Sequence, residues 1–126
     1  MVIIYCRHVV VTLCILGLIV VFAQFESAKA AGGYFSGLTD LPLMTGLTED
    51  RAATVVFDKP QGRIVKMTAT GRVSRAAVMN YYARALPQLG WKFALPGRFR
   101  RDGELLLINI SGSGKNLTVR FSLSPE

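Results

Sequence analysis

The stretch SRAAVMNYYARALPQLGW, from Ser74 to Trp91, decides the fold because it contains a complete helix with its start and end signals. Ser74 is a typical N-cap residue, since its hydroxyl can accept a hydrogen bond from a backbone N–H of the first turn. Apolar residues then recur at steps of three and four, which indicates one apolar stripe: Val78, Met79, Tyr82, Leu86 and Leu89. The sequence therefore predicts an amphipathic helix that begins at Arg75.

The end of this helix is marked by Pro87 and Gly90. Proline has no N–H and its ring crowds the preceding turn, so we expect the regular helix to weaken or end near Leu86. Gly90 can adopt the left-handed conformation that terminates a helix. The segment WKFAL then alternates, and it predicts a strand with Trp91, Phe93 and Leu95 facing the core. We interpret the whole stretch as a folding device that requires no ligand.

Strand patterns lie on both sides of the helix. Residues 54–58 and 63–70 are rich in β-branched residues, and they flank a KPQG turn, which predicts a hairpin. ELLLINI at 104–110 is an apolar strand, and LTVRFSL at 117–123 alternates strictly. PGRFRRDG at 96–103 is a basic strand end or connection, closed by an Asp-Gly turn signal. The predicted fold class is α+β: a small, mostly antiparallel sheet in the order β-β-α-β-β-β, with one helix packed on a face.

The first thirty residues have the pattern of a secretory signal peptide. Arg7 precedes an uncharged apolar run over residues 9–23, and Ala28 and Ala30 follow with the A-x-A spacing of a signal peptidase site. We expect cleavage after Ala30. The alternative is an uncleaved membrane anchor, although a helix over residues 9–23 would extend about 22 Å, less than the ~30 Å hydrocarbon core of a bilayer.

The remaining chain divides into an arm and a domain. Residues 31–51, AGGYFSGLTDLPLMTGLTEDR, contain no helical or alternating period, so they are expected to form an extended N-terminal arm. Their apolar side chains need cover, and we expect the arm to lie across the small α+β domain of residues 52–126. The alternative is that the arm docks on a partner.

The composition argues against catalysis. Cys6, Cys14 and His8 all lie in the predicted leader, so the rest of the chain has no imidazole base, no thiol nucleophile and no ordinary zinc site. The segment SGSGK at 111–115 lacks the first Gly and the following Ser or Thr of a phosphate-binding loop. We predict that the protein is not an enzyme and that it has no catalytic residue, no cofactor and no metal site.

Basic residues are the strongest candidates for contact with a partner. Without residues 1–30 the chain has 13 basic and 7 acidic residues, because the leader removes 2 from 15 and 1 from 8, which leaves a net charge of +6. Arg98, Arg100 and Arg101 form the densest cluster and are candidates to contact an anionic lipid surface or a polyanion. The alternative is a solvated strand end with Phe99 turned inward. Nucleic acid is not an expected partner of an exported domain.

At FSGLTDLPLMTGL, VVFDKPQGRIV, YYARALPQLGW and LTVRFSLSP the chain resembles a group of small uncharacterised exported bacterial proteins. The resemblance implies an envelope location, the periplasm once the leader is cleaved, and a small α+β domain; it implies no functional residues. The leading hypothesis is a non-enzymatic exported module that binds an envelope protein or an anionic envelope component. The alternative is a membrane-tethered accessory subunit held by an uncleaved N-terminal helix. A remote alternative is a hydrolase with an unrecognised carboxylate site.

We predict that the exported protein begins at Ala31, because the apolar run is short and is followed by the A-x-A spacing. The intact mass of the protein, recovered from the envelope of an exporting bacterium, measures the start site directly. A membrane-embedded species that begins at Met1 would contradict cleavage and favour the tethered subunit.

Overall fold

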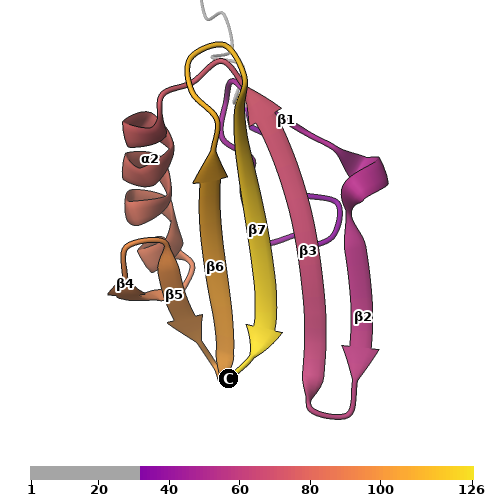
Figure 1. Cartoon of the computed structure of the whole chain (residues 1–126). Coiled ribbons are helices and arrows are strands. Elements are labelled where there is room, and N and C mark those ends of the chain that lie inside the picture. Colours follow the sequence, from indigo (N-terminus) through magenta and orange to yellow (C-terminus); the bar gives the residue numbers. More distant parts are fainter. Residues whose placement is uncertain (1–31) are drawn as a thin grey trace, which may run out of the picture. The chain divides into compact units, whose positions relative to one another are not determined.

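The computed structural model describes residues 32–126, and the predicted signal peptide, with Ala28 and Ala30, lies outside the described residues (Figure 1). The described elements follow in the order β1 (Leu47–Glu49), the 3-10 helix η2 (Arg51–Ala53), β2 (Val55–Lys59), β3 (Gly62–Gly71), α2 (Arg75–Gln88), β4 (Lys92–Leu95), β5 (Arg98–Arg101), β6 (Glu104–Ser111) and β7 (Leu117–Pro125).

The seven strands form one antiparallel sheet in the order β1-β3-β7-β6-β5-β4, and β2 pairs with β3 on the same side as β1. After the β2–β3 hairpin, α2 crosses to the far edge, and β4 to β7 return strand by strand until β7 pairs with β3. The α+β class is confirmed, but the predicted order β-β-α-β-β-β is wrong. A short strand precedes the hairpin, and RFRR forms a full strand, β5, because it pairs with both β4 and β6.

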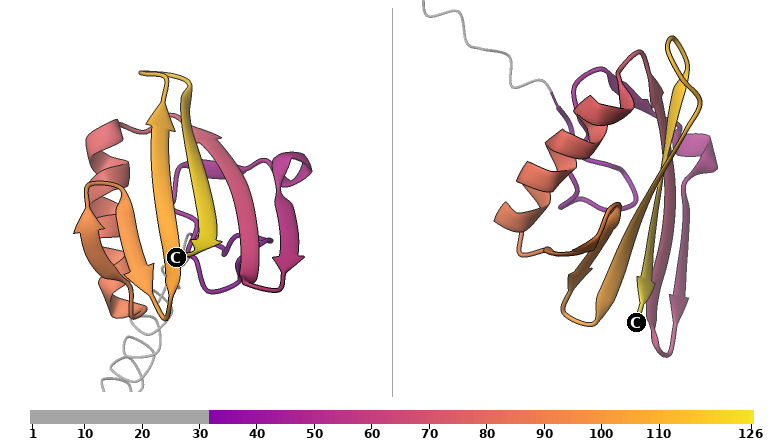
Figure 2. Two further views of the ribbon diagram at one scale, coloured as in Figure 1. Left: turned by 60° about the horizontal axis from the view of Figure 1, so that its bottom comes forward. Right: turned by 60° about the vertical axis from the view of Figure 1, so that its left-hand side comes forward.

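The core lies on one face of the sheet, beneath α2 and the segment that precedes β1 (Figure 2). Strict alternation along β7 directs Leu117, Val119, Phe121 and Leu123 into this core. The other buried side chains come from the arm, β3, α2, the residue before β4, β5 and β6: Phe35, Leu38, Leu41, Leu47, Val65, Met67, Ala69, Val78, Tyr82, Leu86, Trp91, Phe99, Leu106 and Ile108.

The arm is part of this core. The ring centroids of Phe35 and Phe121 are 4.8 Å apart, so residues near the two ends of the described chain contact each other. The Tyr82 hydroxyl donates to the Pro42 carbonyl at 3.0 Å. Burial raises the pKa of Tyr82 well above its ordinary value, so the phenol remains neutral and able to donate. β1, which pairs with β3, lies inside the segment for which no regular structure was predicted.

Both ends of α2 use their predicted signals, with one difference. Ser74 Oγ accepts from the Ala77 N–H at 3.0 Å, as expected of an N-cap. The helix continues through Pro87 to Gln88, because a proline this close to the end interrupts only one hydrogen bond of the helix. Gly90, with φ of +85°, then ends it: the Gly90 N–H bonds Pro87 O and the Trp91 N–H bonds Leu86 O, the pattern of a Schellman motif.

Of the three WKFAL side chains expected in the core, only Trp91 is buried, at 2% exposed. Phe93 and Leu95 are 62% and 56% exposed. β4 is the last strand of the sheet, and its register shifts between these two residues, so neither side chain is covered. Trp91 itself precedes the strand and packs at the end of α2.

We predict that Trp91→Ala destabilises the protein by about 3–5 kcal/mol, because it removes a large buried ring from a small core. Leu95→Ala is the matched control, and we expect a loss of about 0.5 kcal/mol or less, since this side chain is exposed. Urea unfolding midpoints measure both values. A loss below ~1 kcal/mol for Trp91→Ala would contradict its role in the core.

Candidate functional site

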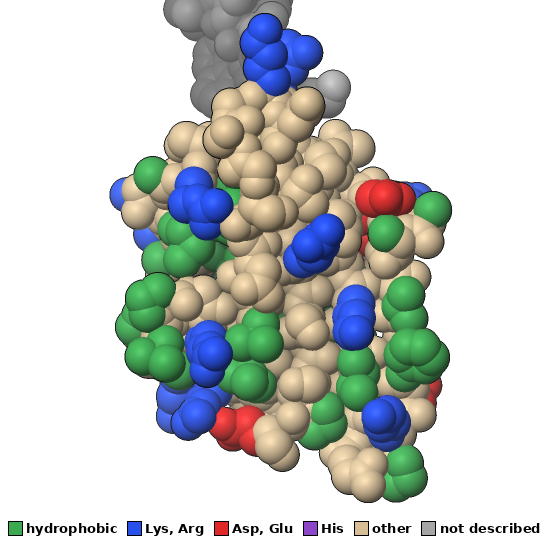
Figure 3. Space-filling view, in the orientation of Figure 1, with side chains coloured by type: hydrophobic (Ala, Val, Ile, Leu, Met, Phe, Trp, Pro, Cys, Tyr) green, Lys and Arg blue, Asp and Glu red, His purple; other side chains and the backbone are tan. Residues whose placement is uncertain are grey.

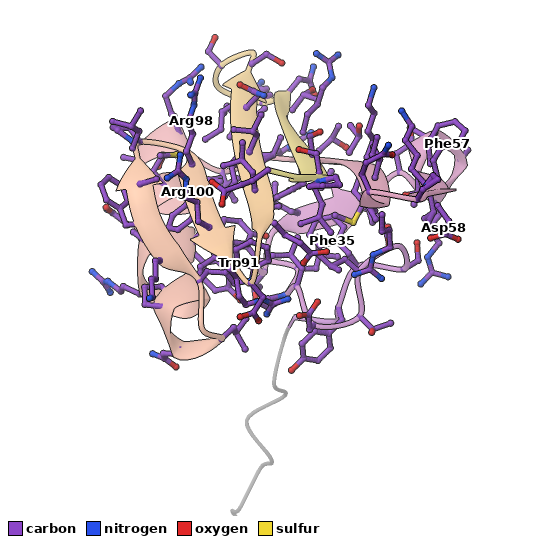
Figure 4. All side chains as sticks on the ribbon, turned by 90° about the horizontal axis from the view of Figure 1, so that it is seen from below. Phe35, Phe57, Asp58, Trp91, Arg98 and Arg100 are labelled. Atoms are coloured by element: carbon purple, nitrogen blue, oxygen red, sulfur yellow. The ribbon has the colours of Figure 1, made fainter. Side chains whose placement is uncertain are left out.

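The candidate site is the face of the sheet that α2 and the arm do not cover, here called the open face. Because successive side chains of a strand point to opposite faces, the buried residues Val65 and Met67 on β3 place Lys66 between them on the open face. In the same way, buried Phe99 on β5 places Arg98 and Arg100 there. Figure 4 shows Arg98 and Arg100 on the opposite side of the sheet from Phe35 and Trp91.

The open face therefore includes two of the three predicted contact residues but not the third. Arg101 has the orientation of Phe99 and turns toward the core. Its guanidinium carbon is 4.3 Å from the centroid of the Trp91 ring, and its two terminal nitrogens donate to Leu89 O at 3.0 Å and to an Asp40 carboxylate oxygen at 2.5 Å. Arg101 joins the arm, the end of α2 and Trp91 and is not part of the open face, so its contact with an anionic surface stays a prediction.

Arg98 and Arg100 differ in their surroundings. Arg100 Nε lies 2.7 Å from a Glu126 carboxylate oxygen, in an ion pair between exposed side chains. Arg98 lies opposite Leu107 on β6 and is exposed. Exposed ion pairs contribute little, so Arg100 remains able to exchange Glu126 for another anion.

The open face carries further basic residues from strands that are far apart in the sequence. Lys66 is aligned with Ser122, and Arg120 lies between Thr68 and Asn109. The pairing registers place two more cations there. Val55 is aligned with Lys66, so Lys59, four residues further along β2, has the same orientation, and Lys92 lies opposite Arg100. The alternating segment LTVRFSL already indicated that Arg120 faces away from the core, but the sequence did not indicate which strands lie beside it.

Acidic residues of the strands are turned the other way. Glu49 is paired with buried Ala69, Asp58 shares a row with Arg63, and Glu104 alternates with buried Leu106, so all three have the orientation of the covered face. The strands thus direct Lys59, Lys66, Lys92, Arg98, Arg100 and Arg120 to the open face and no acidic residue of β1 to β7 with them. Figure 3 shows Lys and Arg side chains spread over this face, with Asp and Glu side chains only near its margins.

A shallow hollow of about 320 Å³ lies within the open face, over β3 and β7. Its wall includes two cations, Lys66 and Arg120, and three neutral hydrogen-bonding side chains, Thr68, Asn109 and Ser122. Val55 and Ala53 bound it on the side of β2. Cations together with hydroxyl and amide groups form a site suited to oxyanions such as phosphate.

A second hollow, of about 440 Å³, lies between the outer side of α2 and Met44 of the arm. Arg84 is the only charged residue of its lining, which also includes Asn80, Tyr81 and Gln88. Burial, and secondarily the neighbouring Tyr34, raises the pKa of Tyr81, so its phenol does not act as a base near neutral pH. The lining of this hollow includes no His, Cys, Asp or Glu side chain.

Four carboxylates within residues 32–126 have partners within the fold: Asp40, Glu49, Asp50 and Glu126. Glu49 accepts hydrogen bonds from the Ser36 N–H and hydroxyl and from Thr54 Oγ1, and Asp50 caps η2. Within residues 32–126, no three His, Cys, Asp or Glu side chains gather as metal ligands would. In the same part of the chain, no helix has the length and apolar character needed to cross a membrane.

We predict that Arg101→Gln lowers the free energy of unfolding by about 1–3 kcal/mol, because it removes the partly buried bonds to Asp40 and Leu89 and the contact with Trp91. Arg98→Gln is the matched control, with an expected change within about 0.5 kcal/mol. Urea unfolding compares the two. Equal stability of both variants would mean that Arg101 does not hold the arm to the end of α2.

No protein-family model matches the chain, and neither the curated proteins nor the solved structures include a significantly similar one. The resemblance to small exported bacterial proteins therefore stays a prediction.

Proposed function

We propose that the protein is a non-enzymatic exported module of the cell envelope, and that its open face binds an anionic surface. The observation that carries this proposal is the separation of charge by the sheet: the strands direct their basic residues, except Arg63 and Arg101, to the open face and their acidic residues to the other. A net positive charge alone could simply keep the protein soluble. Basic residues gathered on one face of the sheet, in contrast, produce a positive potential in front of that face.

The strength of this contact follows from the number of cations involved. Each basic residue near an anionic membrane surface contributes about 1 kcal/mol. Lys66, Arg98 and Arg120 together would then contribute roughly a hundredfold in affinity. Arg100 is left out of this sum because it is paired with Glu126, and Lys59 and Lys92 are left out because they lie on the edge strands β2 and β4. Such binding is detectable and reversible but not tight.

The apolar residues of the open face suit a membrane surface better than a soluble polyanion. Leu105 and Leu107 of β6 are half-buried on this face, between Arg98 and Arg100 on one side and Ser122 and Ser124 of β7 on the other. Headgroup phosphates can satisfy the cations while the aliphatic side chains contact the interfacial region of the lipid. A soluble polyphosphate would engage the cations alone.

We predict that the protein, in the form that an exporting host produces, co-sediments with vesicles that contain phosphatidylglycerol and not with neutral vesicles. The triple substitution of Lys66, Arg98 and Arg120 by Gln should weaken this binding about a hundredfold. Raising the salt should also weaken it, since exposed charges are screened beyond ~8 Å at physiological ionic strength.

The control is a second triple variant, Arg72→Gln, Arg75→Gln and Arg84→Gln, which loses the same charge from exposed positions on and just before α2. It should retain most of the binding. Equal loss in the two triple variants would contradict a role for the open face and leave only a general effect of net charge. Competition by soluble polyphosphate measures how much of the affinity the cations supply without lipid.

A further inference from the structure

Strand β2 has an outer edge with which no other described strand pairs. All five of its residues are exposed, including three consecutive apolar ones: Val55, Val56 and Phe57 are 37%, 49% and 56% exposed. An edge strand with apolar side chains on both faces and unpaired backbone groups is a template for another strand.

The other edges of the sheet are protected and β2 is not. β1 has only three residues, and it runs directly into η2. β4 has four residues and an irregular register between Phe93 and Leu95, which interrupts a regular ladder. β2 pairs with β3 over its whole length without a register shift, and its charged residues, Asp58 and Lys59, stand next to the turn.

We propose that β2 pairs antiparallel with β2 of a second copy of this chain, about a two-fold axis that passes beside Phe57 and is normal to the sheet. A strand is always able to pair with itself in this antiparallel sense, and the two-fold operation closes the assembly at a dimer. This proposal does not rest on the proposed function, because the dimer is formed by backbone and apolar groups of β2, and of the open-face cations only Lys59 lies on this strand.

The backbone limits the register. Lys59 and Gly62 flank a two-residue turn, and in such a hairpin the flanking pair is hydrogen-bonded, so alternation directs the N–H and C=O of Val56 and Asp58 outward. These outward groups meet if Val56 of one copy lies opposite Asp58 of the other. Phe57 then faces its own counterpart in a non-hydrogen-bonded pair, where side chains lie closest.

Charge and strand length favour this register over the two neighbouring ones. A shift that centres the axis on Asp58 would oppose two carboxylates and would place Pro60, which has no N–H, in the new ladder. A shift toward Val56 would leave Lys59 beyond the end of the partner strand, opposite Ala53 in η2. The Phe57 register opposes no like charges directly and pairs all five residues, with Lys59 beside Val55 of the second copy.

Sedimentation velocity over a range of loading concentrations tests the dimer. We expect a dissociation constant on the order of 10 μM, as suits a small interface. Phe57→Lys places two ammonium groups opposite each other, and Val56→Pro removes an outward donor and leaves the β3 ladder intact. Each should weaken the dimer at least tenfold, whereas Leu95→Lys, on the opposite exposed edge, should leave it unchanged.

A cross-link provides a test that does not depend on these disruptive variants. In a background with Cys6 and Cys14 changed to Ser, Phe57→Cys should give a disulfide-linked dimer on mild oxidation, because the two-fold axis brings this position opposite itself in a non-hydrogen-bonded pair, with about 4.5 Å between Cα atoms, a separation that a disulfide can span. Lys59→Cys is the control and should cross-link far less, since Lys59 lies opposite Val55.

The salt dependence distinguishes this dimer from binding to an anionic surface. Screening reduces the repulsion between two copies that each carry a net positive charge, so the dimer should persist or strengthen as salt rises, while vesicle binding weakens. A protein that stays monomeric up to about 300 μM, well above that constant, would overturn the proposal. So would a dimer that both β2 variants leave intact, or larger oligomers that grow with concentration, which would indicate pairing of β2 with β4.

Discussion

One face of the sheet must be covered for this chain to fold, and a single 14-residue helix is too narrow to cover it. The arm supplies the rest: Phe35, Leu38 and Leu41 are as deeply buried as the helix residues Val78 and Tyr82. Arg101 holds these two covers together through Asp40 on the arm and Leu89 at the end of α2. The open face stays uncovered because α2 and the arm, the segments of residues 32–126 that cover the sheet, both lie on its other face (Figure 2).

Local signals predicted the local features. Ser74 predicted the start of α2, the KPQG segment predicted the turn between β2 and β3, and Asp102-Gly103 predicted the turn between β5 and β6, where both residues have positive φ. Each depends on a few neighbouring residues. The continuation of α2 past Pro87 was missed because the cost of a proline depends on how many turns follow it, and here none does.

The order of the strands and the membership of the open face could not be predicted in the same way. Lys66, Arg98 and Arg120 share a face only because β7 lies between β3 and β6, and no short pattern records that pairing. The inward orientation of Arg101 could have been predicted, since an inward Phe99 in an alternating segment implies an inward Arg101. Phe93 shows the opposite case, because its alternation was read correctly and yet nothing covers the last strand.

The position of β7 has a consequence for when the domain can fold. Its residues 117–123 pair with residues 65–71, so the centre of the sheet joins segments about fifty positions apart, and Phe121 also contacts Phe35 of the arm. Until β7 is available, β3 and β6 lack the strand that lies between them. The core side chains of α2 and the arm then have no central strand to pack against. Contacts this distant in the chain make folding slow. Synthesis from the N-terminus therefore leaves the centre of the sheet unpaired until β7 has been made, so the sheet can close only late.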